Sequence, residues 1–167
     1  INVDDLPTSI NEIELANPNK KYYINENKKI LYTQDTKEIV MCYSKDENIN
    51  LKEEEILRIG NYAFKQAVNA KNIILPSSLK WIGSQVFNTC QKIEEIKIGA
   101  SVDYINPIFK YGNYAGKVII DENNPNYMIE NDILYNKDKT KLCRVLYKIK
   151  GEFDVDESVQ QIGELAF

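Results

Sequence analysis

A short pattern of apolar residues recurs along this chain of 167 residues at a spacing of 23. Four apolar pairs coincide at this spacing: Ile73/Ile96, Leu75/Ile98, Leu79/Val102 and Ile82/Ile105. A unit of this length cannot bury its apolar face alone, so neighbouring copies must stack. The repeat therefore predicts a solenoid, and we expect Ile73, Ile96 and Val118 to lie on adjacent parallel strands.

Further copies lie on both sides of this pair. The next one returns after 22 residues, with Ile96 aligned to Val118. An earlier copy occupies residues 49–64 and carries one extra residue in the acidic stretch 53–55. A later copy in residues 153–167 stops at its phenylalanine, Phe167. We therefore expect the chain to be a segment of a longer protein.

Each copy is predicted to form one short strand and one short helix. The strand supplies two inward residues, and a turn leads to a second inward pair. In residues 59–67 the apolar spacing changes toward that of a helix, with Ala63, Phe64 and Ala67 on one side. The predicted fold is an α/β solenoid with a short parallel sheet on one face and short helices on the opposite face.

A longer period of roughly 103 residues overlies the short one. The triplet Ile30-Leu31-Tyr32 returns as Ile133-Leu134-Tyr135, between stretches rich in Asn and Lys. Short apolar runs separated by such turn residues favour β-hairpins. We predict one solenoid domain over residues 1–167, with hairpin insertions at about 17–43 and 124–147 and repeat turns at about 49–120 and 153–167.

Several phrases in these repeats resemble those of a known family. Residues 75–83 read LPSSLKWIG, followed by Val86, Phe87 and Cys90, while residues 59–64 read IGNYAF and 124–127 read NPNY. They are similar to BspA-type leucine-rich repeats over nearly the whole chain, with weaker likeness before Ile13 and at 106–109. The resemblance implies a secreted or surface-exposed bacterial protein that adheres to host matrix or to other cells, and it implies no catalytic residue.

Composition excludes several classes of function. A net charge of −4 and a pI near 5.0 argue against nucleic acid or anionic lipid as a partner. No run reaches the roughly 18 apolar residues of a membrane span, so no membrane insertion by this segment is expected. The chain contains no histidine, the commonest general base and metal ligand, and we expect no enzyme activity, cofactor or metal. Cys42, Cys90 and Cys143 are interpreted as core thiols without disulfides.

Three polar or aromatic features have a structural interpretation. The acidic run 53–55 is interpreted as a solvated turn. Residues 121–126 lack the central glycine and closing glutamate of a calcium loop and are interpreted as the turn into the second hairpin. The eleven tyrosines are expected to pack between neighbouring turns, although a tyrosine-rich hairpin that binds glycans is an alternative. Trp81 is expected to be partly exposed.

Strand alternation selects a candidate partner-binding stripe. If Ile73 and Leu75 point inward, the residue between them points outward, and the same rule applies to every copy. The predicted stripe comprises Asn50, Ile74, Lys97, Ile119 and Asp154. Clustered exposed apolar groups mark interaction surfaces, so we predict a protein partner, such as a host matrix or cell-surface protein. The alternative is a structural spacer that displays other domains of a surface protein.

Overall fold

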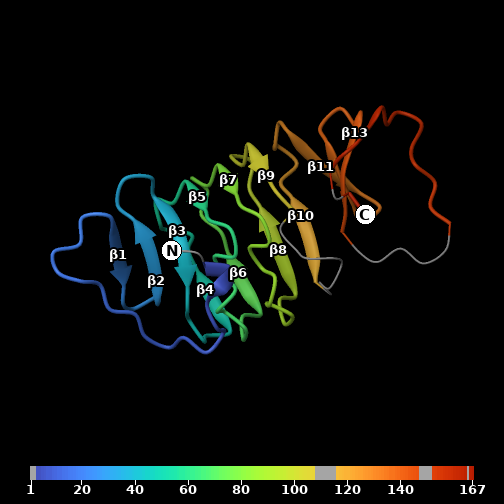
Figure 1. Cartoon of the computed structure of the whole chain (residues 1–167). Helices are drawn as coiled ribbons and strands as arrows, with labels where there is room; N and C mark the ends of the chain where they lie inside the picture. The colour runs from blue at the N-terminus through green and yellow to red at the C-terminus, as the bar shows by residue number, and fades with distance from the viewer. Residues whose placement is uncertain (1–2, 108–115, 147–151, 165) are drawn as a thin grey trace.

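The computed structural model describes residues 3–107, 116–146, 152–164 and 166–167. Successive turns of chain stack along one axis, which runs from β1 to β13 in Figure 1. Backbone pairing joins the strands into three sheets, here called sheets A, B and C. The architecture is therefore a solenoid, as the repeat predicts, but its turns are built from β-strands.

Sheet B contains one strand from each of four consecutive turns, all parallel. Its strands are β4 (Asn48–Asn50), β6 (Asn72–Ile74), β8 (Glu95–Ile98) and β10 (Lys117–Ile120), in that spatial order. Ile73 pairs with Ile49 and Ile96, and Ile96 pairs with Val118. This confirms the expected parallel arrangement, with steps of 24, 23 and 22 residues between neighbours.

Sheet A lies along the other side of the same turns. Its strands, in spatial order, are β1 (Tyr22–Asn25), β2 (Ile30–Thr33), β3 (Glu38–Cys42), β5 (Arg58–Ile59), β7 (Trp81–Ile82) and β9 (Tyr104–Ile105). Ile59 and Ile82 of sheet A share one buried cluster with Ile73 and Ile96 of sheet B. The core of the solenoid therefore lies between these two sheets.

The register also locates the irregularities of the repeat. Ile49 and Ile73 are 24 residues apart in sheet B, whereas Ile59 and Ile82 are 23 apart in sheet A. The extra residue therefore lies between β4 and β5, where the acidic stretch 53–55 is found. Glu53 and Glu55 are exposed, as expected of a solvated turn, whereas the Glu54 side chain is 23% exposed and contacts Lys28 at 2.6 Å.

The predicted helices on the opposite face are wrong. In the described residues the one helix is the 3-10 turn η1 (Val3–Asp5), and residues 61–66 and 84–89 form successive turns. Tyr62 and Gln85, which are 23 residues apart, have φ angles of 58° and 52°. A left-handed residue at this position stops an α-helix from propagating.

The backbone groups of these turns form local i to i−3 bonds, such as that from the Lys65 amide to the Tyr62 carbonyl at 2.8 Å, and further bonds to neighbouring copies. The Ala63 carbonyl accepts from the Cys42 amide at 2.7 Å, and the Phe64 amide donates to the Val86 carbonyl at 3.1 Å. Amides satisfied in this way are not available for a helical i to i−4 bond. Stacking between copies therefore replaces the local helix that the spacing of Ala63 and Phe64 suggests.

The two hairpins have matching geometry. Sheet C contains β11 (Tyr127–Glu130), β12 (Ile133–Asn136), β13 (Lys141–Val145) and β14 (Gln161–Ile162). Strands β12, β13 and β14 lie 103 residues after β2, β3 and β5, and the same register shift occurs at Leu31/Tyr32 and at Leu134/Tyr135. Neither hairpin projects as a free arm. The strands β3 and β13 pair in parallel with the repeat strands β5 and β14, respectively.

The first hairpin separates two packed regions. Ile30 and Tyr32 face the main core, whereas Leu31 packs in a separate cluster with Val3 and Leu6 of the N-terminal segment. Two polar contacts hold this segment in place: Gln66 Nε2 donates to the Pro7 carbonyl at 2.6 Å, and Lys45 Nζ donates to the Thr8 carbonyl at 3.1 Å. Both faces of β2 are therefore covered.

A buried asparagine supports the start of the second hairpin. The Asn124 amide nitrogen donates to the Gly99 and Val102 carbonyls at 3.0 Å, and its oxygen accepts from the Asn126 and Tyr127 amides at 2.9 Å. This network agrees with the interpretation of residues 121–126 as a turn. In the first hairpin Asn19 is the structural counterpart of Asn124, because its side-chain oxygen likewise accepts from the amides two and three residues ahead.

Candidate binding surfaces

Four of the five stripe residues lie side by side on the outer face of sheet B. Asn50 pairs with Ile74, Lys97 pairs with Ile119, and β6 and β8 are adjacent strands. These four residues, Asn50, Ile74, Lys97 and Ile119, are called the sheet B row below. Ile74 is 48% exposed and the Lys97 side chain is 76% exposed, whereas Ile119 is half-buried.

The fifth stripe residue, Asp154, lies elsewhere. It is exposed, but it belongs to no strand and sheet B ends at β10. The second hairpin intervenes between β10 and this copy, so the strand register cannot continue directly. The row therefore has four members, and the prediction that Asp154 extends it is wrong.

Neighbouring polar groups hold the surroundings of the row in place. Lys97 contacts Glu95 on its own strand at 3.3 Å, and Asn72 donates to Asn48 across two strands at 2.8 Å. The surface thus offers one exposed isoleucine between polar groups, on a backbone fixed by pairing on both sides of β6 and β8. Such a surface can make contacts with little loss of conformational entropy.

A second row, which the sequence analysis did not identify, lies on the outer face of sheet A. Arg58, Trp81 and Tyr104 pair across three adjacent strands and are called the sheet A row below. The Arg58 guanidinium carbon is 4.2 Å from the Trp81 ring centre. The Trp81 and Tyr104 rings are stacked at 6.2 Å with an angle of 6° between their planes. Trp81 is half-buried, as expected, and Tyr104 is 49% exposed.

The signal for this row is present in the repeat. Each of its residues directly precedes an inward isoleucine: Ile59, Ile82 or Ile105. The alternation that selects the sheet B row selects these outward positions too. Periodicity alone does not single them out, because the residues that follow them, as in 59–67, have the apolar spacing of a helix.

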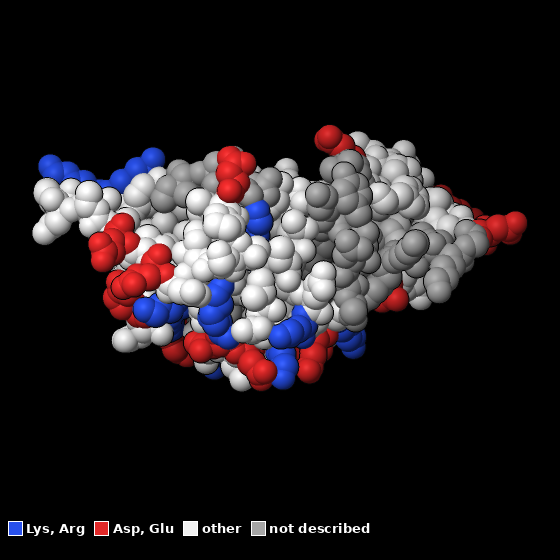
Figure 2. Space-filling model, turned by 60° about the horizontal axis from the view of Figure 1, so that its bottom comes forward, with Lys and Arg blue, Asp and Glu red and all other residues white. Residues whose placement is uncertain are grey.

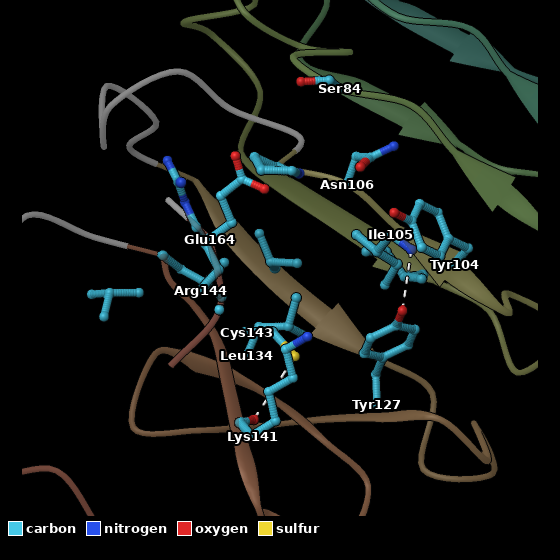
Figure 3. A pocket seen from close by; sticks show the side chains of 16 residues that line it. Ser84, Tyr104, Ile105, Asn106, Tyr127, Leu134, Lys141, Cys143, Arg144 and Glu164 are labelled. Carbon is cyan, nitrogen blue, oxygen red and sulfur yellow. Dashed lines mark hydrogen bonds between the residues drawn. The ribbon is translucent and has the colours of Figure 1, made fainter. Parts of the chain in front are cut away.

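A cavity of about 420 Å³ lies between the repeat turns that carry Ser84, Ile98 and Val118 and the second hairpin. In Figure 3 the Tyr104 and Tyr127 rings lie on one side of it, and Arg144 and Glu164 lie on the other. The Tyr127 hydroxyl accepts a hydrogen bond from the Ile105 amide at 3.3 Å, which joins β9 to the hairpin.

The chemistry of the cavity does not suggest catalysis. Cys143 is its thiol, and burial raises the pKa of that thiol, which lowers its nucleophilicity at neutral pH. Burial likewise raises the pKa values of Cys42 and Cys90 to about 12. Cys42 and Cys90 are buried, all three cysteines are free, and they pack as thiols as expected.

Most hairpin tyrosines are packing groups. Tyr32, Tyr43 and Tyr135 are buried, and Tyr23, which is partly exposed, stacks on Tyr32 at 4.8 Å. Rings held in this way present few open faces to a sugar. The described hairpins thus give the glycan alternative little support.

Charges on the surface are mixed. Figure 2 shows acidic and basic side chains interleaved along one border of the molecule, with an uncharged area in the middle of the view. Across the described residues, no group of three or more Cys, Asp or Glu side chains is arranged to hold a metal ion. The described part of the chain likewise contains no helix that is long and apolar enough to cross a membrane.

A solved structure shares this fold. The chain is similar to the pneumococcal vaccine antigen PcpA, with 22% identity and a TM-score of 0.60, over 74% of this chain and 31% of that one. It is also similar to a leucine-rich repeat protein from Eubacterium ventriosum, with 27% identity and a TM-score of 0.47, over 66% of this chain and 30% of that one. The chain thus spans about three tenths of the length of each structure.

The sequence itself matches a family model. No curated protein matches the chain. The model of the BspA type leucine-rich repeat region, however, matches residues 37–167 in 6 copies. This range includes the turns that form sheet B and both candidate rows. The chain therefore belongs to the BspA-type leucine-rich repeat family.

Proposed function

We propose that this chain is a non-catalytic module of a secreted or cell-surface bacterial protein, and that it binds a protein partner through the sheet B row. The observation that carries the proposal is the exposed Ile74 at the centre of a rigid parallel sheet, flanked by Asn50 and Lys97. Apolar anchors near the centre of an interface contribute more to affinity than rim charges do.

Two further observations support a binding role over a catalytic one. The chain has no histidine, and burial raises the pKa of each cysteine thiol. Nearly all apolar positions of the repeat are used for packing between turns. The groups left for function are therefore those on the outer faces of the sheets.

The test compares binding by the wild type and by surface variants. The chain is titrated against a panel of purified extracellular-matrix proteins, with micromolar binding expected for at least one of them. The double variant Ile74→Asp with Lys97→Glu should weaken that binding at least tenfold, or about 1.4 kcal/mol. Ile119 is left unchanged, because it is half-buried and a charge there would also affect folding.

Asp154→Lys is the matched control, since it changes an exposed charge outside the row. It should bind as the wild type does, and all three proteins should have the same melting temperature. Equal weakening by the control would remove the sheet B row from the account. Binding only by the full-length parent, and never by this segment, would favour the structural spacer instead.

A further inference from the structure

The last turn of the solenoid has apolar side chains open to solvent. It comprises the described residues 152–164 and 166–167, at the end of the stack opposite β1 (Figure 1). Ile162 is 46% exposed, Phe167 is 64% exposed and Val155 is also exposed. These three residues define a surface called the end face below. Exposed apolar groups of this size mark a surface that another element covers.

The equivalent positions are fully buried in the first copy of this turn. Ile59 and Phe64, which precede Ile162 and Phe167 by 103 residues, have no exposed surface. Both copies follow a hairpin in the same way, because β5 pairs with β3 as β14 pairs with β13. The difference lies on the other side, where β5 pairs with β7 of the next turn, whereas β14 is the last strand of sheet C. In the first copy the next turn therefore provides the burial.

The free edge of β14 has the hydrogen-bonding groups for a parallel neighbour. In the first copy the Ile59 carbonyl accepts from the Gly83 amide of the next turn at 2.9 Å. The equivalent carbonyl, that of Ile162, accepts from no amide in the part of the chain that the structure describes. A strand edge with unpaired backbone groups is a template for another strand.

The sheet B side of the last turn lacks a neighbour as well. Strand β4 has β6 of the next turn as its partner in sheet B, and the Leu51 amide donates to the Ile74 carbonyl at 2.9 Å. Residues 152–156 correspond to this region in sequence, with Val155 aligned to Leu51, but they form no strand. Pairing with a following turn is what β4 has and residues 152–156 do not.

The geometry of stacking selects the sequence of the occupant. A turn that stacks carries an inward isoleucine, a glycine directly after it and a phenylalanine four residues after the glycine, as in Ile82, Gly83 and Phe87. Phe87 packs on Phe64 with 5.3 Å between ring centres. The glycine permits close approach, because a Cβ on Gly83 would lie 2.8 Å from backbone atoms of the preceding turn. The end face carries the same motif and therefore matches a turn of this kind.

We propose that the end face binds a further turn of the same repeat, which stacks on β14 as β7 stacks on β5. The isoleucine of that turn pairs with Ile162, and its phenylalanine packs on Phe167. Residues 153–155 then gain a parallel partner, as β4 does from β6. Contacts between neighbouring turns supply much of the stability of a solenoid, so the added turn stabilises the last one.

The test joins the turns that cover β5 to the end face. Residues 65–107 directly follow Phe64, so a copy of them is appended after Phe167 of the full chain. The matched control appends the same residues with Ile73→Asp, Ile82→Asp and Phe87→Asp in the copy. The melting temperature should rise by at least about 5 °C with the first extension and by less than about 1 °C with the control. Hydrogen exchange should show new protection of the Val155 amide with the first extension alone.

Two variants then assign the gain to the end face. The gain is the difference in melting temperature between the extended and unextended forms of each variant, so a direct effect of the substitution cancels. Ile162→Asp should abolish the gain. Ile74→Asp changes a similarly exposed isoleucine in the sheet B row and should preserve it, which separates this inference from the proposed function.

Three results would overturn the proposal. The first is an equal melting temperature for the two extensions, and the second is a gain that survives Ile162→Asp. The third is dimerisation of the unextended chain, measured by sedimentation, that Ile162→Asp abolishes. This last result would assign the end face to a second copy of the chain.

Discussion

Replacing Gly83 with alanine tests the close stacking of consecutive turns. A Cβ at this position would lie 2.8 Å from the Asn61 amide nitrogen and 2.8 Å from the Gly60 carbonyl carbon. Both are backbone atoms of the preceding turn. The pairing of β7 with β5 and with β9 keeps Gly83 and this turn close together. They would have to retreat by roughly half an ångström, and overpacking of this kind costs about 1–3 kcal/mol.

Gly99→Ala is the matched control, because a Cβ there meets no atom within 4 Å. A change of about 2 kcal/mol lowers the melting temperature of a chain of this size by about 4–8 °C. We expect that drop for Gly83→Ala and a shift of at most about 0.5 kcal/mol for Gly99→Ala, measured by thermal and urea unfolding. Equal stability of the two variants would refute the claim that the glycine is needed for stacking.

Two other predictions concern ionisable groups. Asp156 accepts from Lys139 at 2.6 Å and from Ser158, which lowers its carboxyl pKa below 3.8. The stability that this pair contributes is fully present above the unfolded pKa of about 3.9 and is lost as the pH falls through the lower folded pKa. The melting temperatures of the wild type and of Asp156→Asn should therefore begin to converge as the pH falls below about 4. A difference that is constant with pH would contradict this. Because Cys42 and Cys90 are buried, they should resist Ellman's reagent at pH 8 in the folded chain, and Cys143 should react first. All three thiols should react in urea. Rapid labelling of Cys42 in the native state would contradict its burial in the core.

The sequence predicts the parts of the fold that depend on which residues point inward. Ile73, Ile96 and Val118 stack because each is the buried member of an alternating strand, and a one-residue change in spacing is absorbed between strands. The hairpins follow from the same logic, since Ile30 and Ile133 begin matching strands 103 residues apart. Side-chain periodicity records these contacts directly.

The opposite side of the solenoid could not be predicted from periodicity alone. Ala63, Phe64 and Ala67 are all buried, as a helix would place them, but the Ala63 carbonyl and the Phe64 amide bond to the adjacent turns. The left-handed conformation of Tyr62 has no marker in the sequence, because tyrosine rarely adopts it. This side also carries the sheet A row, and only the strand pairing of Arg58 with Trp81 brings its members together.

The sequence predicts the four members of the sheet B row, but it does not predict where the row ends. Alternation identifies Asn50, Ile74, Lys97 and Ile119 as neighbours, and the strand pairing places them together. Asp154 satisfies the same local pattern but follows the second hairpin, and local spacing does not record that interruption of sheet B. Strand alternation likewise does not predict that Ile119, on the last strand of sheet B, is half-buried.

The central claim is that a protein partner is bound on the outer face of sheet B. Hydrogen–deuterium exchange of the chain, free and bound to the matrix protein that it recognises, tests this claim most directly. The account predicts that added protection on binding is concentrated in β4, β6, β8 and β10. Protection confined to the hairpin strands β1–β3 and β11–β13, with sheet B unchanged, would contradict it.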